Sequence, residues 1–590
     1  METINLVLND IDYITHDEKP IIRLFGQDTN TKENIIAIDK TFKPYIYIKP
    51  YNTEKCIEEL KILGINNLEL VKKIDIGVET EFIKATFTHP QEIPKLRDII
   101  TESKQVKEIR EHDILFYRRY LINNNLIPTT TITIEGKEIK DKKIYKQENT
   151  RLINIEKHVS QENKTEPQKI LIFDIEVYNK KGMPQAERDP IIMIGLADNK
   201  GYQKVLSTKK SSKEYVKTLS NEKEMLYEFQ RIIQEKKPDI IIGYNSDNFD
   251  LPYIKKRTEV LKIKLNLGID NSEIKFIRQG FNNAGQIKGV THIDLYKLIR
   301  SYLNLDRYTL ERVYKELFNV QKHDLPGDQI WEYWEDPERI HELFEYSLDD
   351  AIKTEEIAEK IIPLTIALTR LVGEPLFDIG RMTTGQMVEW YLIRKAYEQN
   401  NIIPNKPTTT QYSKRRGSKK IIGGYVKEPE KGLFEDIAYL DFRSLYPSII
   451  IAKNISPDTI LDEEDNFTPH HKTPELNYKF KKDPKGFIPS IIGNILTKRQ
   501  EIKSLMKKET NIEEKKSLDL EQQGLKRLAN SMFGAYGYSR FRWYKLECAE
   551  SITAWGRDYI RKSMDEAEKQ GFKPLYADTD GFYATYIGDK

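Results

Sequence analysis

Cysteine is nearly absent from this chain of 590 residues, which contains only Cys56 and Cys548. Two cysteines exclude a disulfide framework and a thiolate zinc site, and they suit a reducing compartment. Any bound metal must therefore be held by oxygen or nitrogen. Long apolar runs are also lacking, and the opening METINLVLND has no basic segment followed by an apolar one. We expect a protein without membrane spans, located in the cytoplasm.

Net charge is also small: it is only +2, although 32% of the residues are charged. Overall charge therefore does not indicate a polyanionic partner, and only local patches of charge can do so. The length exceeds what one hydrophobic core serves, and it predicts about three to five domains.

The distribution of apolar runs predicts a multi-domain α/β and α+β protein. Residues 1 to about 140 alternate strand-like runs, such as IIRLF, with polar turns, which indicates one small mixed domain. Residues 140–169 are charged and poor in apolar periodicity, which predicts a surface connection. The runs KILIFDIEVY, PIIMIGLAD and PDIIIGYN that follow are typical of strands buried on both faces of a sheet.

The second half of the chain shows helical patterns. Residues 337–362 and part of 380–400 have helical periodicity, and IAYLDFRSLYPSIIIAKN indicates a strand that turns into a helix near Pro447. Two more helices are expected within residues 494–538, separated by the charged KKETNIEEKKSLD.

A first set of carboxylates lies in the α/β region. FDIEV places Asp174 and Glu176 two apart on a strand, so both side chains leave the same face. Asp250 follows a buried strand, and Tyr346 and Asp350 are spaced i and i+4 on a helix. Each acid alone is more often a surface residue than a ligand. Together they can bind two Mg²⁺ or Mn²⁺ ions, about 3.5 to 4 Å apart, as phosphodiester hydrolysis requires.

A second set lies near the C-terminal end of the sequence. Asp441 ends a strand, and the hairpin YADTDG carries Asp578 and Asp580. Asp441 and Asp580 can bridge two Mg²⁺ ions, with Asp578 in support, as in-line attack on a phosphate requires.

Basic residues accompany this second set. Arg499 and Lys503 share one helix face, and Lys526, Asn530 and Phe533 share a face of the next helix. Arginine and lysine on one face recognise phosphate, although solvated basic faces are the commoner interpretation of such spacing.

Taken together, these motifs resemble the family B DNA polymerases, most closely their archaeal replicative branch. FDIEV, YNSDNFD and YSLDD are similar to the three exonuclease motifs, and DFRSLYPSII, KRLANSMFG and YADTDG are similar to polymerase motifs A, B and C. Six motifs in the right order make this resemblance specific, and it covers nearly the whole chain.

The resemblance implies a role for each matching residue. It implies palm metal ligands at Asp441 and Asp580, supported by Asp578, and a steric gate against ribose at Tyr446. Triphosphate contacts are implied at Arg499, Lys503, Lys526 and Asn530, with Lys526 as the proton donor to pyrophosphate. Exonuclease metal ligands are implied at Asp174, Glu176, Asp250 and Asp350, with Tyr346 beside them.

The N-terminal part resembles the archaeal domain that reads uracil in the template. Eight positions match its pocket: Tyr13, Pro44, Tyr45, Pro90, Ile93, Ile114, Phe116 and Arg119. A flat slot of aromatic and aliphatic groups can stack a flipped base, while an arginine meets a phosphate. From the residues alone, most of these positions are expected in a core.

The resemblance also implies a domain order. We expect an N-terminal domain at 1–165, with 362–404 packing back on it, and an RNase H-like 3′-5′ exonuclease domain at 166–361. A palm with an antiparallel sheet is expected at 405–489 and 540–590, with two-helix fingers at 490–539.

The sequence departs from the family pattern at several positions. Motif B has Phe533 where tyrosine is usual, and the motif usually written Y-x-G-G has Ile421 in the tyrosine position. The two cysteine pairs of thermophilic relatives cannot form, since only Cys548 remains in that region. His470 and His471 are interpreted as solvated histidines rather than as metal ligands.

The sequence ends soon after YADTDG, whereas family B enzymes continue with the rest of the palm and a helical thumb that grips duplex DNA. We expect weak duplex binding from this chain alone. Some archaeal members are encoded as two polypeptides that divide after this motif. We favour a small subunit carrying the thumb as partner over a fragment cut at this point, and contact with a sliding clamp stays open.

The leading hypothesis is therefore a DNA-directed DNA polymerase with proofreading exonuclease, acting on primer-template DNA and dNTPs. One alternative is an exonuclease whose polymerase half is idle in the isolated chain. Another is a non-catalytic DNA-binding or uracil-sensing module, against which the intact acids of both sites argue.

Overall fold

The computed structural model describes residues 1–140, 150–162, 166–279, 282–320, 325–417 and 421–587. The chain forms two compact units. Unit 1 comprises Met1–Phe42 and Phe116–Met382, and unit 2 comprises Lys43–Leu115 and Thr383–Lys590. Within the described ranges, no helix is both long and apolar enough to cross a membrane. These units cut across the predicted functional division, which stays a prediction.

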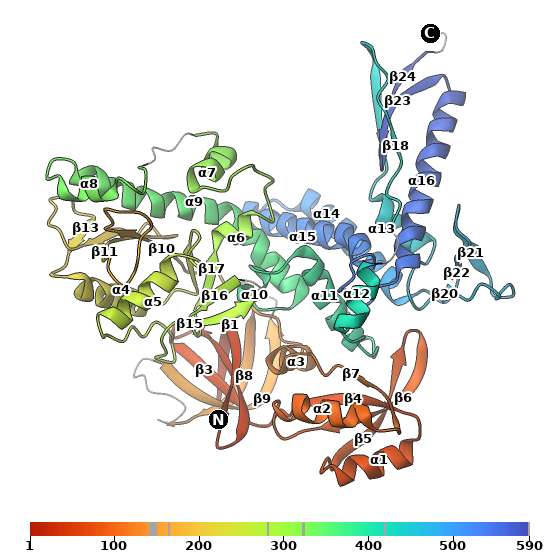
Figure 1. The fold of residues 1–590 in the computed structure, drawn as a ribbon, viewed down its shortest axis with the longest axis horizontal. Coiled ribbons are helices and arrows are strands. Elements are labelled where there is room, and N and C mark those ends of the chain that lie inside the picture. Colours follow the sequence, from red (N-terminus) through yellow and green to blue (C-terminus); the bar gives the residue numbers. More distant parts are fainter. Residues whose placement is uncertain (141–149, 163–165, 280–281, 321–324, 418–420, 588–590) are drawn as a thin grey trace. The chain divides into compact units, whose positions relative to one another are not determined.

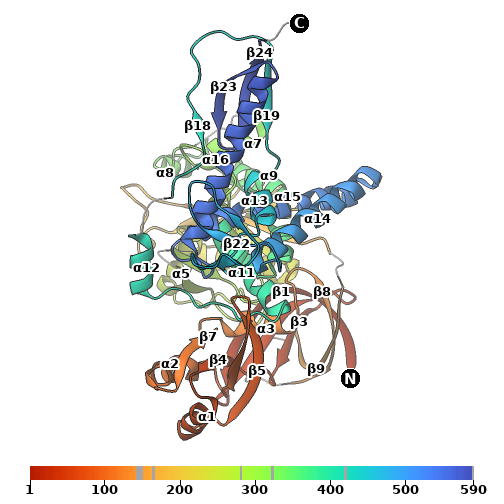
Figure 2. The ribbon, with the colours of Figure 1, turned by 90° about the vertical axis from the view of Figure 1, so that its right-hand side faces the viewer.

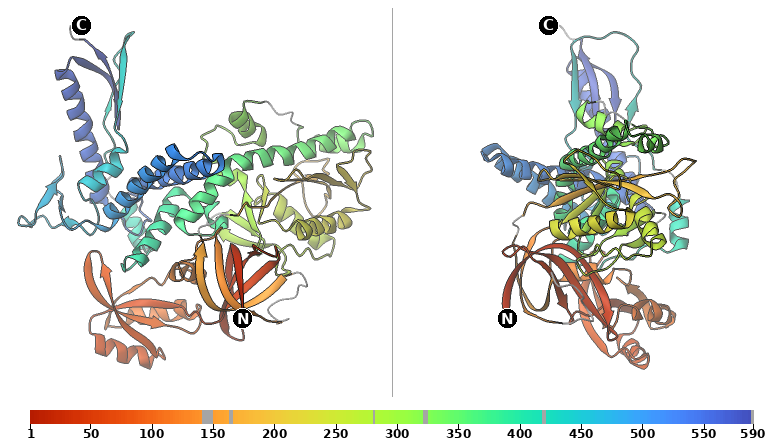
Figure 3. Two further views of the ribbon diagram at one scale, coloured as in Figure 1. Left: turned by 180° about the vertical axis from the view of Figure 1, so that it is seen from behind. Right: turned by 90° about the vertical axis from the view of Figure 1, so that its left-hand side faces the viewer.

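Unit 1 begins with a closed five-stranded barrel (Figures 1 and 3). Its strands, in the order of pairing, are β1 (Glu2–His16), β2 (Lys19–Asp28), β3 (Asn34–Asp39), β9 (Thr150–Glu162) and β8 (Thr131–Glu138). Alternate residues of β2 face opposite sides: Ile22 and Leu24 fill the barrel with helix α3 (Phe116–Asn123), while Ile21 and Phe25 pack outward.

Strand β9 corrects the prediction of a surface connection over residues 140–169. Ile153 and Ile155 point into the barrel core, and Leu152 points to the opposite side. The charged composition of the segment concealed this period-2 pattern, and only a few apolar residues are needed to fix a strand whose neighbours supply the rest of the core. Residues 141–149 and 163–165 of the predicted connection lie outside the described residues.

A six-stranded sheet follows the barrel in unit 1, and its core is continuous with the outer face of the barrel. In spatial order its strands are β13 (Val216–Thr218), β12 (Gln203–Ser207), β11 (Ile191–Asp198), β10 (Ile170–Val177), β14 (Ile240–Gly243) and β17 (Thr291–Asp294). Strand β11 runs antiparallel to both of its neighbours, β10 and β12, whereas β14 and β17 run parallel to β10.

Helices cover this sheet on both faces. They are α4 (Glu222–Lys236), α5 (Asp250–Val260), α6 (Leu295–Ile299), α7 (Leu310–Phe318), α8 (Ile330–Glu335), α9 (Ile340–Val372) and α10 (Leu376–Ile379), with the hairpin β15 (Lys275–Gln279) and β16 (Asn282–Gln286). The long green helix α9 runs along one face (Figure 1), where Ile357 and Ile361 pack with Ile172 of β10. Asp174 and Glu176 alternate in step with Ile172, so they share one face of the sheet, as predicted. That face is the one that α9 covers.

Unit 2 contains a four-stranded antiparallel sheet formed by residues close to the N-terminus of the sequence. Its strands, in spatial order, are β5 (Asn67–Asp75), β6 (Val78–Thr86), β4 (Tyr45–Pro50) and β7 (Val106–Arg110). Helices α1 (Thr53–Ile62) and α2 (Glu92–Glu102) complete this part of the unit. Ile46, Ile48 and Ile83 form its core, and Cys56 is buried there.

The rest of unit 2 is built around a second antiparallel sheet. Its strands are β18 (Val426–Lys427), β23 (Phe572–Asp578), β24 (Gly581–Tyr586) and β19 (Ile437–Asp441). Figure 2 shows helix α16 (Leu546–Lys569) alongside this sheet, where Ile560 and Met564 pack against Phe582. Tyr439 and Tyr583 remain exposed, with ring centroids 4.6 Å apart.

Further helices and a small sheet surround these elements. They are α11 (Thr384–Glu398), α12 (Thr409–Arg416), α13 (Leu445–Ala452), α14 (Phe487–Lys508), α15 (Ile512–Tyr536), β20 (Ile460–Leu461), β21 (His470–Lys472) and β22 (Lys479–Lys481). The interruption between α14 and α15 is shorter than predicted and covers only Glu509–Asn511. Ile512 and the charged residues after it form the first turns of α15. The side chain of Asn511 caps this helix by accepting hydrogen bonds from the backbone N–H groups of Glu513 and Glu514.

Candidate active sites

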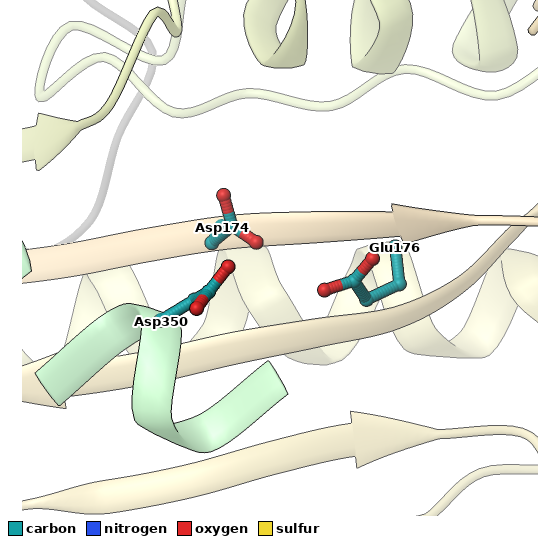
Figure 4. Close-up of side chains that lie close together, drawn as sticks. All are labelled: Asp174, Glu176 and Asp350. Carbon is teal, nitrogen blue, oxygen red and sulfur yellow. The ribbon is translucent and has the colours of Figure 1, made fainter. Parts of the chain in front are cut away.

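Three of the predicted exonuclease acids come together in unit 1. Asp174, Glu176 and Asp350 each offer a carboxylate oxygen within 4.8 Å of the other two (Figure 4). Asp174 and Glu176 come from β10 and Asp350 from α9, and both Glu176 and Asp350 are buried. Neighbouring carboxylates in a buried setting need a cation or a proton, because their mutual repulsion is poorly screened there.

The approach of α9 to the sheet depends on Gly195, which the sequence reasoning missed. Gly195 of β11 is directly opposite Asp174 in the sheet register. A Cβ atom at this position would overlap the carbonyl oxygen of Ser347 and lie 3.0 Å from its Oγ. A glycine inside a buried strand is the sequence signal for such a close approach.

Asp250 occupies a different position from the other three acids. It starts α5, is only 2% exposed, and its Oδ1 accepts a hydrogen bond from the backbone N–H of Ile175, the residue between Asp174 and Glu176. Burial raises the pKa of Asp250 to about 7. The structure therefore places Asp250 against the strand that carries Asp174 and Glu176, but outside the group of three.

The loop before Asp250 is held by Asp294 at the end of β17. The carboxylate of Asp294 accepts hydrogen bonds from the backbone N–H groups of Asn245 and Asp247, at 2.8 and 3.2 Å.

Tyr346 lies one turn before Asp350 on α9, half-buried against a cluster that includes Met193 and Leu343.

The second carboxylate set lies in unit 2 at the end of the β19–β24 pair. Asp441 pairs with Gly581 across the strands, and the backbone N–H of Phe442 donates to the carbonyl oxygen of Asp580 at 2.7 Å. Burial raises the pKa of Asp580, and the neighbouring charges of Asp441 and Asp578 raise it further. Pairing of β19 with β24 thus brings together acids that are far apart in the sequence.

Tyr446 of α13 lies between two neighbours in unit 2. Its ring centroid is 4.3 Å from that of Phe533 on α15, and a Cβ added at Gly556 of α16 would lie 3.1 Å from its Cε1. Burial raises the pKa of its phenol. Phe533 therefore packs on Tyr446 without the hydroxyl group that is usual at its position.

The predicted basic residues also meet in unit 2. The neighbouring Arg499 chiefly lowers the pKa of Lys503, and Arg443 and Lys526 contribute to the same effect. Arg443, two residues after Asp441, is thus part of this positive cluster although the sequence reasoning did not assign it. The lowering of the Lys503 pKa by neighbouring cations indicates a local excess of positive charge that suits a polyphosphate.

The residues of the predicted uracil pocket belong to both units, and each group is described within its own unit. In unit 1, the rings of Tyr13 and Phe116 meet edge to face at 5.3 Å, and Arg119 is buried. In unit 2, Tyr45 packs with Tyr47 and Phe82 and is 5% exposed. Pro44 and Ile114 are buried, whereas Pro90 and Ile93 are half-buried.

Both carboxylate sets fit divalent metal ions by the chemistry of their donors. Each consists of carboxylate oxygens, which are ligands that Mg²⁺ and Mn²⁺ prefer. Among the described residues, the Asp174 group alone gathers three such oxygens within the distance given above.

Comparison with known proteins assigns both halves of the chain. Residues 107–313 match the exonuclease domain of DNA polymerase family B, and residues 381–585 match DNA polymerase family B. The DNA polymerase of Pyrococcus glycovorans is 45% identical, covering 98% of this chain and 71% of its own length. That of Thermococcus gorgonarius is 44% identical with the same coverage.

A solved structure agrees with these matches. The family B DNA polymerase from the hyperthermophilic archaeon Pyrobaculum calidifontis superimposes with a TM-score of 0.85 and 29% identity, over 99% of this chain and 75% of its own. Fold and sequence thus define a DNA polymerase with an exonuclease domain. The chain belongs to the archaeal family B DNA polymerases.

Proposed function

We propose that this chain carries out template-directed DNA synthesis from dNTPs at one carboxylate site and 3′-5′ proofreading at another. The observation that carries the proposal is the presence of two separate acid sets: Asp174, Glu176 and Asp350 in unit 1, and Asp441 beside Asp580 in unit 2. Each set fits Mg²⁺, with Mn²⁺ as an alternative ion. When bound in pairs, such ions supply Lewis-acid stabilisation of the attacking and leaving oxygens.

In the exonuclease site, four acids would hold the ions: Asp174, Glu176, Asp250 and Asp350. Tyr346 orients the attacking water through its phenol. The close contact at Gly195 fixes the helix that supplies Tyr346 and Asp350, so the site depends on the packing of α9 as well as on its ligands.

In the synthesis site, Asp441 and Asp580 are the metal ligands and Asp578 supports them. The positive cluster holds the triphosphate through Arg499, Lys503, Lys526 and Asn530. The Nζ of Lys526 donates the proton to the leaving pyrophosphate. Tyr446, fixed between Phe533 and Gly556, excludes a ribose 2′-hydroxyl.

A functional division of the chain follows from these roles. We assign the six-stranded sheet and α9 to an RNase H-like 3′-5′ exonuclease domain, at 166–361. The β18–β23–β24–β19 sheet is the palm, at 405–489 and 540–590, and the pair α14 and α15 forms the fingers, at 490–539. The N-terminal domain is 1–165 with 362–404.

The N-terminal domain senses uracil in the template, and within unit 1 the residues assigned to this recognition are Tyr13, Phe116 and Arg119. The edge-to-face pair of Tyr13 and Phe116 offers an aromatic surface for a flipped base. A primer-extension reaction should stall ahead of template uracil, and Phe116→Ala should relieve the stall. Equal extension on uracil and thymine templates would contradict this assignment.

The chain spans 71% of the length of these two relatives, and the part of the family's fold outside the matched span contributes to efficient synthesis. We assign that part to the remaining palm and a thumb, carried on a second polypeptide, which supplies phosphate contacts to duplex DNA in the cytoplasm. Adding the partner polypeptide should raise primer extension and leave degradation of single strands unchanged.

A pair of substitutions tests the two-site proposal. Asp580→Ala should abolish extension and leave exonuclease activity intact, whereas Asp174→Ala should do the reverse. Loss of both activities in either variant would contradict separate sites. The second candidate function is an exonuclease with an idle polymerase half. It is favoured by the observation that, among the described residues, the acids of the Asp174 group alone bring three carboxylate oxygens close together. It would be favoured if extension stays absent with the partner while Asp174→Ala abolishes degradation.

A further inference from the structure

The glycine segment Ile421–Tyr425 of unit 2 lies directly against the turn that carries Asp578 and Asp580. The backbone N–H of Thr579 donates to the carbonyl oxygen of Tyr425 at 2.8 Å, and Val426 pairs with Asp578 in the sheet. A Cβ at Gly424 would lie 2.8 Å from Oγ1 of Thr579 and 3.1 Å from its Cα. The turn and the segment are therefore packed too closely to move independently.

Thr579 itself needs outside support. Its φ angle is +56°, a conformation that a β-branched residue adopts only at a cost. The hydrogen bond from its backbone N–H to Tyr425 helps to hold Thr579 in this conformation. Displacing the segment would thus allow this strained turn to relax.

The segment is also held by Arg557 of α16. Nη1 of Arg557 donates to the carbonyl oxygens of Ile422 and Gly423, at 3.0 and 2.8 Å. Ile422 and Gly423 belong to no helix or strand. The Arg557 side chain therefore supplies the hydrogen bonds that a neighbouring strand would otherwise donate to their carbonyl groups. Arg557 is only 6% exposed, which makes the loss of these bonds costly.

Glu475, between β21 and β22, fixes the guanidinium of Arg557. Its Oε2 accepts from Nε and Nη2 of Arg557, at 3.1 and 2.7 Å, and its Oε1 accepts from Nη1 of Arg561 at 2.8 Å. The guanidinium of Arg561 in turn lies 5.0 Å from the ring centroid of Tyr425. Two arginines one turn apart on α16 therefore contact the glycine segment: Arg557 contacts Ile422 and Gly423, and Arg561 contacts Tyr425.

These contacts leave Arg557 little capacity to bind anything else. A guanidinium has five N–H groups, and the four bonds to Glu475, Ile422 and Gly423 occupy most of them. The preceding residue, Gly556, is the one packed against Tyr446. A single turn of α16 thus contacts the tyrosine of the synthesis site and holds the segment that supports its acids.

We infer that Arg557 is a positioning residue for synthesis: through Ile422, Gly423 and the glycine segment it fixes the turn that carries Asp578 and Asp580. The inference rests on the proposed role of these acids in binding metal. Glu475 orients Arg557, and Gly424 is required because any side chain there would push the turn away.

Terbium binding tests this inference on the full chain without requiring synthesis. Tb³⁺ replaces Mg²⁺ at carboxylates, and tyrosines near Asp441 and Asp580 sensitise its luminescence. All variants carry Asp174→Ala and Glu176→Ala, so that the exonuclease acids do not contribute. Asp580→Asn serves as the reference that removes the site, and Lys562→Gln, an exposed change on the same helix, is the matched control.

Arg557→Gln and Gly424→Ala should each weaken Tb³⁺ binding about 10-fold, the usual effect of losing a residue that orients a metal ligand. Arg557→Lys should recover part of the affinity, because an ammonium can meet a carbonyl but not also the carboxylate of Glu475. Lys562→Gln should leave the affinity unchanged. Thermal unfolding of each variant shows whether the fold is retained.

Two results would overturn the inference in different ways. If Asp580→Asn removes the signal while Arg557→Gln and Gly424→Ala bind Tb³⁺ normally, Arg557 does not position the turn. If Asp580→Asn leaves the signal unchanged, the metal assignment itself is wrong. In extension assays with the partner present, Arg557→Gln should lower kcat. A rise confined to the KM for primer-template would instead assign Arg557 to DNA contact.

Discussion

Replacing Gly195 by alanine should disable the exonuclease site without altering any of its acids. Gly195 faces Asp174 across the sheet, and the added methyl group would overlap the carbonyl oxygen of Ser347 on α9. Since nonbonded atoms settle about 3.5 Å apart, α9 must withdraw by on the order of 1 Å. Asp350 and Tyr346 lie on the displaced turns of the helix and would move with it.

The size of the effect follows from this displacement. A misplacement of about 1 Å costs about 100-fold in rate when reacting groups must be aligned. Overpacking of this kind costs about 1 to 3 kcal/mol of stability, which unit 1 can tolerate because its core extends from the barrel through the sheet. The variant should therefore be folded, polymerising and defective in proofreading.

Degradation of a single-stranded oligonucleotide, labelled at its 5′ end, measures the loss directly. Gly327→Ala is the matched control in the same unit, because a Cβ at Gly327 would meet no atom of the described residues within 4 Å. Extension with the partner present should be the same in both variants. Exonuclease activity of Gly195→Ala within 3-fold of the parent would refute the argument that this contact sets the position of α9.

Other perturbations have equally definite outcomes. Tyr446→Val should raise the kcat/KM for ribonucleotides relative to dNTPs by about 10- to 100-fold; unchanged discrimination would remove Tyr446 as the gate. Lys526→Ala should lower kcat for extension about 100-fold, while the exposed Lys516→Ala should not; equal effects would contradict a role in proton transfer. Burial raises the pKa of Asp10 from 3.8 to about 6, so its contribution to stability is full below the lower value and is lost as pH rises through the higher one. Relative to the parent, Asp10→Asn should therefore gain about 2 kcal/mol between about pH 4.5 and pH 7.5 in urea unfolding, and a change of the opposite sign would exclude Asp10 as the cause.

Local spacing alone predicted much of the candidate sites. Asp174 and Glu176 share a face because strand side chains alternate, and Tyr346 and Asp350 share one because a helix repeats every 3.6 residues. The hairpin of Asp578 and Asp580 follows from its turn residues. Backbone geometry fixes such relations within a few residues, so no knowledge of distant contacts is needed.

The misses have a common cause, which is dependence on distant partners. Strand β9 was expected as a surface connection because it has few apolar residues of its own. Those residues are buried only because the other strands of the barrel supply the rest of the core. Arg443 and Gly195 carried weak local signals, and their roles depend on Lys503 and Ser347, which belong to other elements.

The sequence by itself determined which residues can do chemistry and in which local elements they lie, because propensity, periodicity and motif spacing act along the chain. Only the tertiary structure decided which of them meet. Pairing of β19 with β24 brings Asp441 to Asp580, packing at Gly195 brings Asp350 to Asp174, and Arg557 joins α16 to the glycine segment. The physical reason is that these contacts result from burying surfaces of distant segments together, and their energies depend on shapes that no local pattern contains.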